Sequence, residues 1–296
     1  MDKHNHNLVF AAIAASTVVS LLGTYFMVQQ QQIDQVGGRA NYSLYKQMVN
    51  NTKYQENVRK SLESQVQMLN GEQPAADTGT ETPAAPSAVT LDTIKGLFVD
   101  GNIHFGSPDA KLLLVEISDP SCPYCHAAAG KNPELSKQMG SQFILKSDGG
   151  SYIAPVAEFK KLVDAGKASF VFLYSNGHGA GELATQALYC AHEKGKFWNV
   201  HDRLMSMEGY NMINNEVKND KANSGKLADF LSKEIDKSFL KDCLESGKYA
   251  KNLVANQQSA SNLGSRGTPG FFVNTTNFAG AVNYTNMESA VTAALK

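Results

Sequence analysis

A short apolar segment that runs directly into a pair of cysteines limits the folds open to this chain more than any other feature. Leu112 to Ile117 reads LLLVEI, which is typical of a strand buried on both faces of a sheet. Cys122 and Cys125 follow within the motif DPSCPYC. Pro123 suits the first turn of a helix, because its missing N–H would have no partner there. The segment therefore predicts a buried strand that leads into a helix, with both cysteines at the helix N-terminus.

The pattern after this motif predicts an α/β domain at 91–296. The expected elements are strands at 169–174, 270–274 and 278–282, a helix at 127–139 broken near Pro133, helices over 181–263 apart from a polar loop at 211–224, and a closing helix at 287–295. The expected order is βαβ, a long helical insert, then ββα.

The chain before this domain divides into three segments. Leu8 to Val28 carries no charge, and a helix of this length, rising about 1.5 Å per residue, would span the roughly 30 Å core of a membrane. Residues 1–28 are therefore expected to be a cytoplasmic tail and membrane anchor, with a cleaved signal peptide as the alternative. Residues 29–70 predict an imperfect amphipathic helix, either a dimerising stalk or a solvated spacer. Residues 71–90, rich in Pro, Ala, Thr and Gly, predict a flexible linker.

Composition bears on partners and on compartment. The chain has 27 basic and 28 acidic residues, so it lacks the basic excess of a wide nucleic-acid-binding surface. Of its four cysteines, Cys190 and Cys243 lie on expected helices of the insert. They fit a structural disulfide, with two free buried thiols as the alternative. A domain exported across a bacterial inner membrane would place the cysteines where disulfides persist.

The first cysteine pair is suited to thiol–disulfide chemistry. The free N–H groups and positive potential of a helix N-terminus favour a thiolate at Cys122, and only the thiolate attacks a disulfide. Cys125, one turn further on, would resolve the mixed disulfide that results. Tyr124 offers the thiolate no charge, so Cys122 is expected to be more acidic than a free thiol, but less so than with histidine in that place.

Three other interpretations of nearby motifs are weaker. A zinc site would want a second close cysteine pair, which Cys190 and Cys243 do not supply. The Cys-x-x-Cys-His string ending at His126 is the pattern of covalent haem attachment, although His126 is expected on a helix surface instead. Residues 177–181, GHGAG, follow a strand as a dinucleotide-binding loop would, but Glu182 stands where the last glycine is required.

Two further positions are candidates for the site. Glu116 is the only ionisable residue in LLLVEI, and a buried acid has a raised pKa that lets it accept or supply the proton of thiol exchange; a solvent-facing acid at a sheet edge is the alternative. Thr268-Pro269 precedes an expected strand. A cis bond there would place the Thr268 backbone beside the cysteines, ready to pair with an extended substrate, whereas an ordinary strand-edge proline is the simpler interpretation.

Together, four segments resemble the DsbA-like branch of the thioredoxin superfamily over residues 98–295. They are the strand that carries Glu116, the CPYC motif, ALYCAHEKGKFWNVHDRLM at 187–205 and RGTPGFFVN at 266–274. The resemblance implies a thioredoxin fold with a helical domain inserted after the third strand, at about 177–264. It also implies a cis Thr268–Pro269 bond that faces the cysteines, Glu116 as the buried acid, and a Cys190–Cys243 disulfide.

The resemblance further implies a thiol-disulfide oxidoreductase that introduces disulfides into exported proteins and needs no cofactor beyond its redox-active cysteine pair. Tyr124 and Thr268 are DsbG-like features, since DsbA has histidine and valine there, so a dimeric disulfide isomerase or reductase stays open. The expected partners are reduced or misfolded exported proteins, a membrane or soluble redox partner, and a second copy bound through the stalk. The expected location is the bacterial inner membrane, with a single-pass anchor and the catalytic domain in the periplasm.

Overall fold

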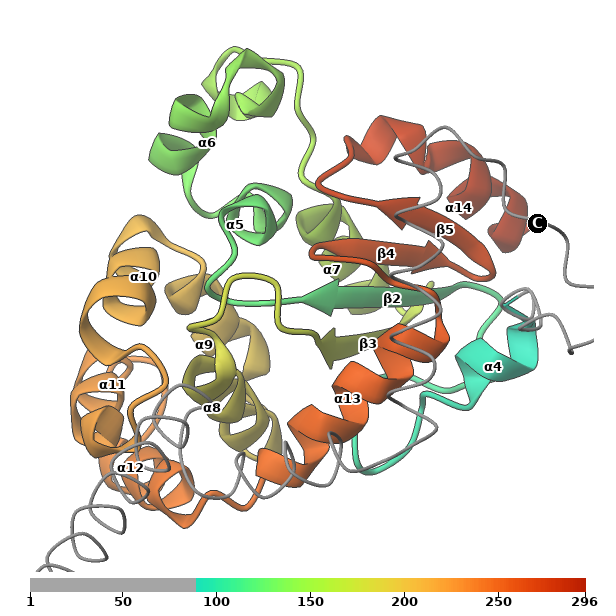
Figure 1. The fold of residues 1–296 in the computed structure, drawn as a ribbon. Helices are drawn as coiled ribbons and strands as arrows, with labels where there is room; N and C mark the ends of the chain where they lie inside the picture. Colours follow the sequence, from blue (N-terminus) through green and yellow to red (C-terminus); the bar gives the residue numbers. More distant parts are fainter. Residues whose placement is uncertain (1–88) are drawn as a thin grey trace, which may run out of the picture. The chain divides into compact units, whose positions relative to one another are not determined.

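The computed structural model describes residues 89–296, which form a β-sheet with helices on both faces (Figure 1). The membrane anchor predicted at 1–28 and the stalk predicted at 29–70 lie outside the described residues, as does nearly all of the linker predicted at 71–90. Within 89–296, none of the helices has the length and apolar character needed to span a membrane.

The sheet of the described residues contains five strands in the order β1-β3-β2-β4-β5. The central strand β2 (Leu113–Ser118) is parallel to β3 (Ser169–Tyr174) and antiparallel to β4 (Gly270–Val273). The edge strands β1 (Ile103–Phe105) and β5 (Thr276–Ala279) are antiparallel to their neighbours β3 and β4. Every residue of β2 and β3 is buried, because helices cover both faces of the sheet.

The helices occupy the chain between and around these strands. They are α4 (Leu91–Lys95), α5 (Pro123–Ala129), α6 (Pro133–Met139), α7 (Pro155–Asp164), α8 (Glu182–Glu193), α9 (Phe197–Leu204), α10 (Met207–Asn211), α11 (Ser224–Phe230), α12 (Lys237–Ser246), α13 (Ala250–Asn262) and α14 (Glu288–Leu295). The run from α8 to α13 lies between β3 and β4, where the sequence predicts the helical insert.

Alternation along β2 sends its side chains to two separate hydrophobic clusters. Val115 and Ile117 pack on one face with residues of α4 and α13, such as Ala260. Leu114 packs on the opposite face, in a larger cluster that includes side chains of α7, α8 and α9. Because Glu116 has the same parity as Leu114, its carboxyl lies on the second face, among apolar side chains.

The helix after the cysteine pair breaks at the predicted proline. α5 ends at Ala129 and is capped by Gly130, which is left-handed with a φ of 70°. α6 begins with Pro133 in its first turn, after Asn132, whose side chain accepts a hydrogen bond from the Leu135 N–H.

Several elements of the structure differ from those expected. β1 was not predicted, since three residues give too short an alternation to recognise. β5 begins two residues before the expected strand at 278–282. The segment expected as a polar loop at 211–224 is largely helical: α10 continues into a π-helical turn, Met212–Val217, and a 3₁₀ turn follows at Lys221–Asn223. Ile213 and Val217 explain this difference, because both are buried and hold the segment on the core.

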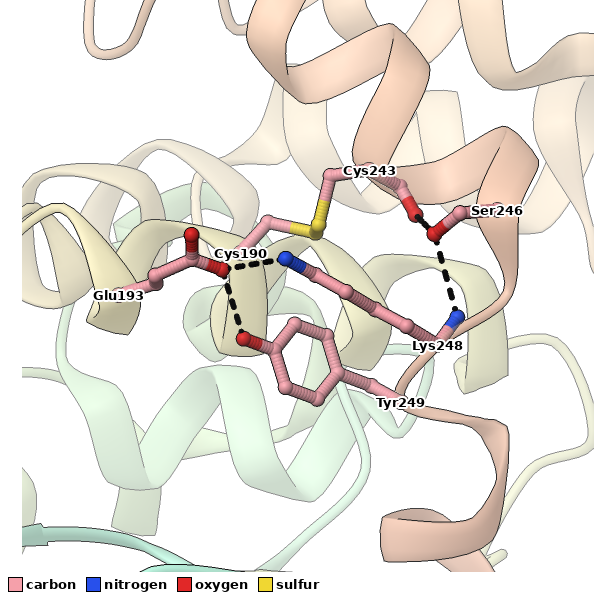
Figure 2. Close-up of a disulfide and its surroundings, with 6 residues drawn as sticks. All are labelled: Cys190, Glu193, Cys243, Ser246, Lys248 and Tyr249. Atoms are coloured by element: carbon pink, nitrogen blue, oxygen red, sulfur yellow. Dashed lines mark hydrogen bonds and ion pairs between the residues drawn. A yellow bond between two sulfur atoms is a disulfide. The ribbon is translucent and has the colours of Figure 1, made fainter.

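The helical insert is cross-linked by a disulfide between Cys190 of α8 and Cys243 of α12 (Figure 2). This is the pairing that the resemblance implies. Beside it, the Glu193 carboxylate bonds the Lys248 ammonium at 2.5 Å and the Tyr249 hydroxyl at 2.8 Å. The disulfide joins α8 to α12, and the polar contacts join α8 to the turn that follows α12.

Candidate active site

The cysteine pair lies where β2 gives way to α5. β2 ends at Ser118, and the chain turns so that the Cys122 N–H donates to the Asp119 carbonyl oxygen at 2.9 Å. Cys122 directly precedes the helix, so its thiol lies beside the free N–H groups of the first turn. Cys122 retains 5% exposure, whereas Cys125 is fully buried, and both are free thiols. A partner can therefore reach Cys122 first.

The two thiols have opposite pKa shifts. The pKa of Cys122 is lowered to about 6, first because the Cys125 thiol donates a hydrogen bond to its thiolate. Burial opposes this effect, while the Thr268 side chain and the N–H groups of Cys125 and Tyr124 assist it. The pKa of Cys125 is raised well above its ordinary value, by burial first and then by the neighbouring Cys122. The pair thus holds one thiolate and one neutral thiol at neutral pH.

We expect the reduced protein to react with iodoacetamide at a rate that reaches its plateau above a midpoint of about pH 6. Below the midpoint Cys122 takes up a proton and loses its nucleophilicity; above it the thiolate is already fully formed. A free thiol would have its midpoint near about pH 8.5 and would keep gaining reactivity above that pH. Alkylation of Cys122, followed by peptide mapping across this range, measures the midpoint. A midpoint near that of a free thiol would contradict the geometry described above.

The loop before β4 closes the other side of the site. The Thr268–Pro269 peptide bond is cis, and the Thr268 carbonyl oxygen accepts a hydrogen bond from the Cys122 thiol at 3.4 Å. The two residues meet because β4, which follows this loop directly, pairs with β2. A groove of about 480 Å³ lies beside the loop, lined mainly by residues 264–270 and by parts of β5. Thr268 therefore presents its backbone between the thiol and an open groove.

Asp119 holds the active-site turn against the loop at 177–178 by hydrogen bonds, a role that the sequence did not predict. One carboxylate oxygen of this buried residue accepts hydrogen bonds from the N–H groups of Gly177 and His178, each at 2.9 Å. The other accepts from the Ser121 N–H and hydroxyl, at 2.8 and 2.7 Å. The GHGAG segment, set aside above as a nucleotide loop, thus packs behind the cysteines. Its glycine content was the sequence signal for this close packing.

Gly177 shows why the segment needs glycine. A Cβ built there would lie 1.8 Å from the Thr268 hydroxyl oxygen, which is far inside a van der Waals contact. We expect Gly177→Ala to displace Thr268, to destabilise the fold by about 1–3 kcal/mol, and to slow Cys122 alkylation. Denaturant unfolding and alkylation rates measure the two effects. Gly267→Ala is the matched control in the neighbouring loop, because a Cβ there meets nothing within 4 Å; equal behaviour of the two variants would contradict the prediction.

Glu116 lies on β2, two residues before Ser118, the last residue of the strand that leads to the cysteine pair. It is fully buried, and neither carboxylate oxygen has a hydrogen-bond partner within the described residues. Burial is the main reason that its pKa is raised, and His201 and Ser118 partly oppose the rise. The Ser118 hydroxyl also acts to lower the pKa of Cys125, so it lies near both groups. The alternative of an acid at a solvent-facing sheet edge is wrong, since β2 is the central strand.

Pro123 and Tyr124, the two residues between the cysteines, lie in the first turn of α5. Tyr124 is 49% exposed and packs its ring edge-on against Phe143. The two residues therefore set the local backbone and the rim of the site, and Tyr124 is available to touch a docked partner.

His126 is not the surface residue that the sequence suggested, because α5 is covered by the helical insert. It is fully buried, and its ring nitrogens lie 2.9 Å from the carbonyl oxygens of Pro120 and Met205. Burial lowers the pKa of His126 to about 4, so the ring is neutral at neutral pH. This imidazole bridges the active-site turn to the end of α9 and is not free to bind a haem iron.

Over residues 89–296, no group of three or more histidine, cysteine or acidic side chains is placed to hold a metal ion.

The chain is similar to several known proteins. A family model described as thioredoxin matches residues 156–293, and a search of curated proteins finds no match. A variant of alpha-DsbA1 from Wolbachia pipientis is 16% identical with a TM-score of 0.50, over 70% of this chain and 96% of that chain. BdbD from Bacillus subtilis is 19% identical with a TM-score of 0.47, over 66% of this chain and 93% of that chain. The catalytic domain of Proteus mirabilis ScsC is 20% identical with a TM-score of 0.47, over 70% and 99%.

The domain has a thioredoxin fold, in which the Cys-x-x-Cys helix and the cis-proline loop meet at the carboxyl end of the central strand β2. In fold, the chain is similar to proteins of the thioredoxin superfamily. Its helical insert lies between β3 and β4, within a fold that is similar to that of alpha-DsbA1.

Proposed function

We propose that this protein is a thiol-disulfide oxidoreductase that introduces disulfides into exported proteins through Cys122 and Cys125. The proposal rests mainly on the difference between the two thiols in exposure and in pKa. Cys122 is nearer the surface and has a lowered pKa, while Cys125 is buried and has a raised pKa. Such a pair keeps one sulfur ready to attack or leave as a thiolate and the other protonated until it resolves.

The reaction needs no cofactor beyond the cysteine pair, which carries two electrons. In the oxidised protein, a client thiolate attacks the Cys122 sulfur, forms a mixed disulfide and releases Cys125, which takes up a proton. A second client thiol loses its proton and attacks the client sulfur of the mixed disulfide. The client disulfide forms and Cys122 leaves as a thiolate. A membrane or soluble redox partner must then remove two electrons to reset the pair.

Glu116 and Thr268 have separate roles in this scheme. The buried carboxyl of Glu116 supplies the proton that Cys125 takes up and removes it again when Cys125 attacks. The Thr268 backbone borders both the Cys122 thiol and the groove at 264–270, which supports pairing with an extended client segment as an added strand.

The proposed location is outside the cytoplasm, on the periplasmic side of a bacterial inner membrane. Support comes from the Cys190–Cys243 disulfide, since such bonds persist in oxidising compartments. The uncharged segment at 8–28, predicted to anchor the chain, is consistent with this location.

The reduction potential of the Cys122–Cys125 couple tests the direction of exchange. A lowered pKa of Cys122 stabilises the reduced form and makes the disulfide more oxidising. We expect a potential well above that of thioredoxin, about −270 mV, measured in glutathione buffers. A value near that of thioredoxin would contradict a role as an oxidase, and failure to reduce insulin would contradict exchange altogether.

A dimeric isomerase or reductase is the second candidate. It is supported by Tyr124 and Thr268 beside the cysteines, and by the stalk predicted at 29–70. Sedimentation of the chain with and without 29–70 distinguishes the two. A monomer in both cases would remove the dimer from consideration.

A further inference from the structure

The turn between β2 and α5, residues 119–122, is held by hydrogen bonds from distant parts of the fold. Ser121 is fully buried, and its hydroxyl oxygen accepts a hydrogen bond from the Ala180 N–H at 3.2 Å. Its carbonyl oxygen accepts another from the side-chain amide of Asn214, also at 3.2 Å. Among the residues that the structure describes, Asn214 is the only one of the α8–α13 segment whose side chain donates to the backbone of this turn. The residue before Cys122 is therefore tied to the helical insert.

Asn214 lies in the π-helical turn Met212–Val217, which continues α10. The turn closes with a hydrogen bond from the Lys218 N–H to the Ile213 carbonyl oxygen, five residues back, at 2.8 Å. Lys218 then adopts a φ of 50°, which is unusual for a residue with a side chain. Turns of the π type are rare and are found mostly at functional sites, and strained backbone persists only where its surroundings fix it. This segment is therefore a candidate for a role in the active site that it touches.

The end of the same segment is attached to the loop behind the cysteines. The Asn219 side-chain amide donates to the Gly179 carbonyl oxygen at 2.8 Å. Its side-chain oxygen accepts hydrogen bonds from the N–H groups of Glu182, at 2.9 Å, and Leu183, at 3.4 Å, in the first turn of α8. Asn214 and Asn219 thus fasten the segment to the active-site region at two points.

The Asn214 hydrogen bonds determine which way its amide points. A second carbonyl oxygen, that of Tyr210, lies 3.1 Å from the same nitrogen, so each of the two N–H groups has one acceptor. The Ser121 carbonyl belongs to the peptide bond that ends in the Cys122 N–H, and this N–H donates to the Asp119 carbonyl oxygen at 2.9 Å. The peptide plane between Ser121 and Cys122 is therefore fixed on both of its sides.

We propose that Asn214 is a positioning residue for Cys122: by holding the Ser121 carbonyl, it fixes the orientation in which the Cys122 sulfur meets the start of α5. The inference rests on the proposed function, since it concerns the sulfur that attacks and leaves in disulfide exchange. The N–H groups of Tyr124 and Cys125 stabilise the thiolate only while the sulfur lies in line with them. A buried carbonyl that lost its donor would turn toward water or another donor, and Cys122 would move with the shared peptide plane.

The test is the pH midpoint of Cys122 alkylation by iodoacetamide in the reduced full-length protein. We expect Asn214→Ala to raise this midpoint by about 0.5 to 1 pH unit, the effect of one lost hydrogen bond that aligns a charged group. The equilibrium of the cysteine pair with glutathione should shift about threefold to tenfold toward the disulfide, because only the reduced form has a thiolate to lose. The substitution removes no ionisable group, so the shift reports the position of the sulfur.

Asn215→Ala is the matched control, in the same π-helical turn. The Asn215 side chain is exposed and donates to the Asn211 side chain at 3.4 Å. We expect this variant to have the wild-type midpoint and the wild-type glutathione equilibrium. A second pair tests the donor itself. Asn214→Asp keeps the shape of the side chain, loses both N–H groups and adds a negative charge, so it should raise the midpoint further than Asn214→Ala. Asn215→Asp adds the same charge one residue away and should raise it much less.

An unchanged midpoint in both Asn214→Ala and Asn214→Asp would overturn the proposal, and so would equal shifts in the matched variants of Asn214 and Asn215. Denaturant unfolding shows whether each variant is folded. If Asn214→Ala is not, the two aspartate variants decide by the same comparison. The alkylation midpoints require no client protein. A wild-type protein that fails to reduce insulin but shows the expected midpoints would therefore overturn the proposed function and leave the positioning of Cys122 by Asn214 intact.

Discussion

Cys122→Ser should abolish disulfide exchange, leaving insulin reduction at the rate of the buffer thiol alone. A serine oxygen cannot form a disulfide, and its hydroxyl is not ionised at the helix N-terminus where the Cys122 thiolate is stabilised. Insulin turbidity with dithiothreitol measures the loss. The substitution removes one buried sulfur and leaves the backbone of α5 unchanged, so the variant should remain folded.

Cys125→Ser is the informative companion to that variant. Cys122 remains able to attack, but the resolving thiol is gone, so mixed disulfides between Cys122 and client proteins should accumulate. Non-reducing electrophoresis and mass spectrometry detect them. Exchange at the wild-type rate in Cys122→Ser would contradict the role of Cys122 as the nucleophile. Trapped complexes in Cys122→Ser rather than in Cys125→Ser would show that the two cysteines have the opposite roles.

Removal of the second disulfide should lower stability without removing exchange. The Cys190–Cys243 bond closes a loop with a sequence separation of 53, and restricting such a loop in the unfolded chain contributes about 4 kcal/mol in the chain-entropy model. We expect Cys190→Ala/Cys243→Ala to lose roughly this free energy of unfolding. Denaturant unfolding measures the loss, and insulin reduction under native conditions should persist.

Glu193→Gln is the control for this prediction. It breaks the ion pair with Lys248 beside the disulfide, but that pair is partly exposed and should contribute at most about 1 kcal/mol. A cysteine double variant no less stable than Glu193→Gln would show that the disulfide does not stabilise the insert. Loss of insulin reduction in a folded double variant would show that Cys190 and Cys243 take part in exchange.

The fold buries both Glu116 and His126, the acid and the histidine on either side of the cysteine motif. Glu116 is buried because β2 is the middle strand of the sheet. Side chains alternate between the two faces along β2, so the Glu116 carboxyl lies on the face of the larger hydrophobic cluster. His126 is buried because the insert covers α5, as its contact with the Met205 carbonyl shows. The sequence could support the first inference from the apolar run around Glu116. It could not support the second, since residues 126 and 205 are adjacent only in the folded chain.

The amino-acid sequence by itself determined the local features of this protein. Continuous apolar runs predicted β2 and β3, Pro123 indicated a helix start and Pro133 a helix break, and the spacing of Cys122 and Cys125 indicated a nucleophile and its resolver. Each of these features depends on residues that lie close together in the sequence, so the sequence alone is enough to recognise it.

Only the tertiary structure decided which distant groups meet. It brought Asp119 against the GHGAG loop, Thr268 against Cys122, and His126 against Met205. Such contacts follow from the pairing of strands and the packing of an inserted helical layer, which join residues far apart in the chain. Side-chain pKa values depend on the same burial and long-range contacts, so the chemistry of the two thiols emerged only with the fold.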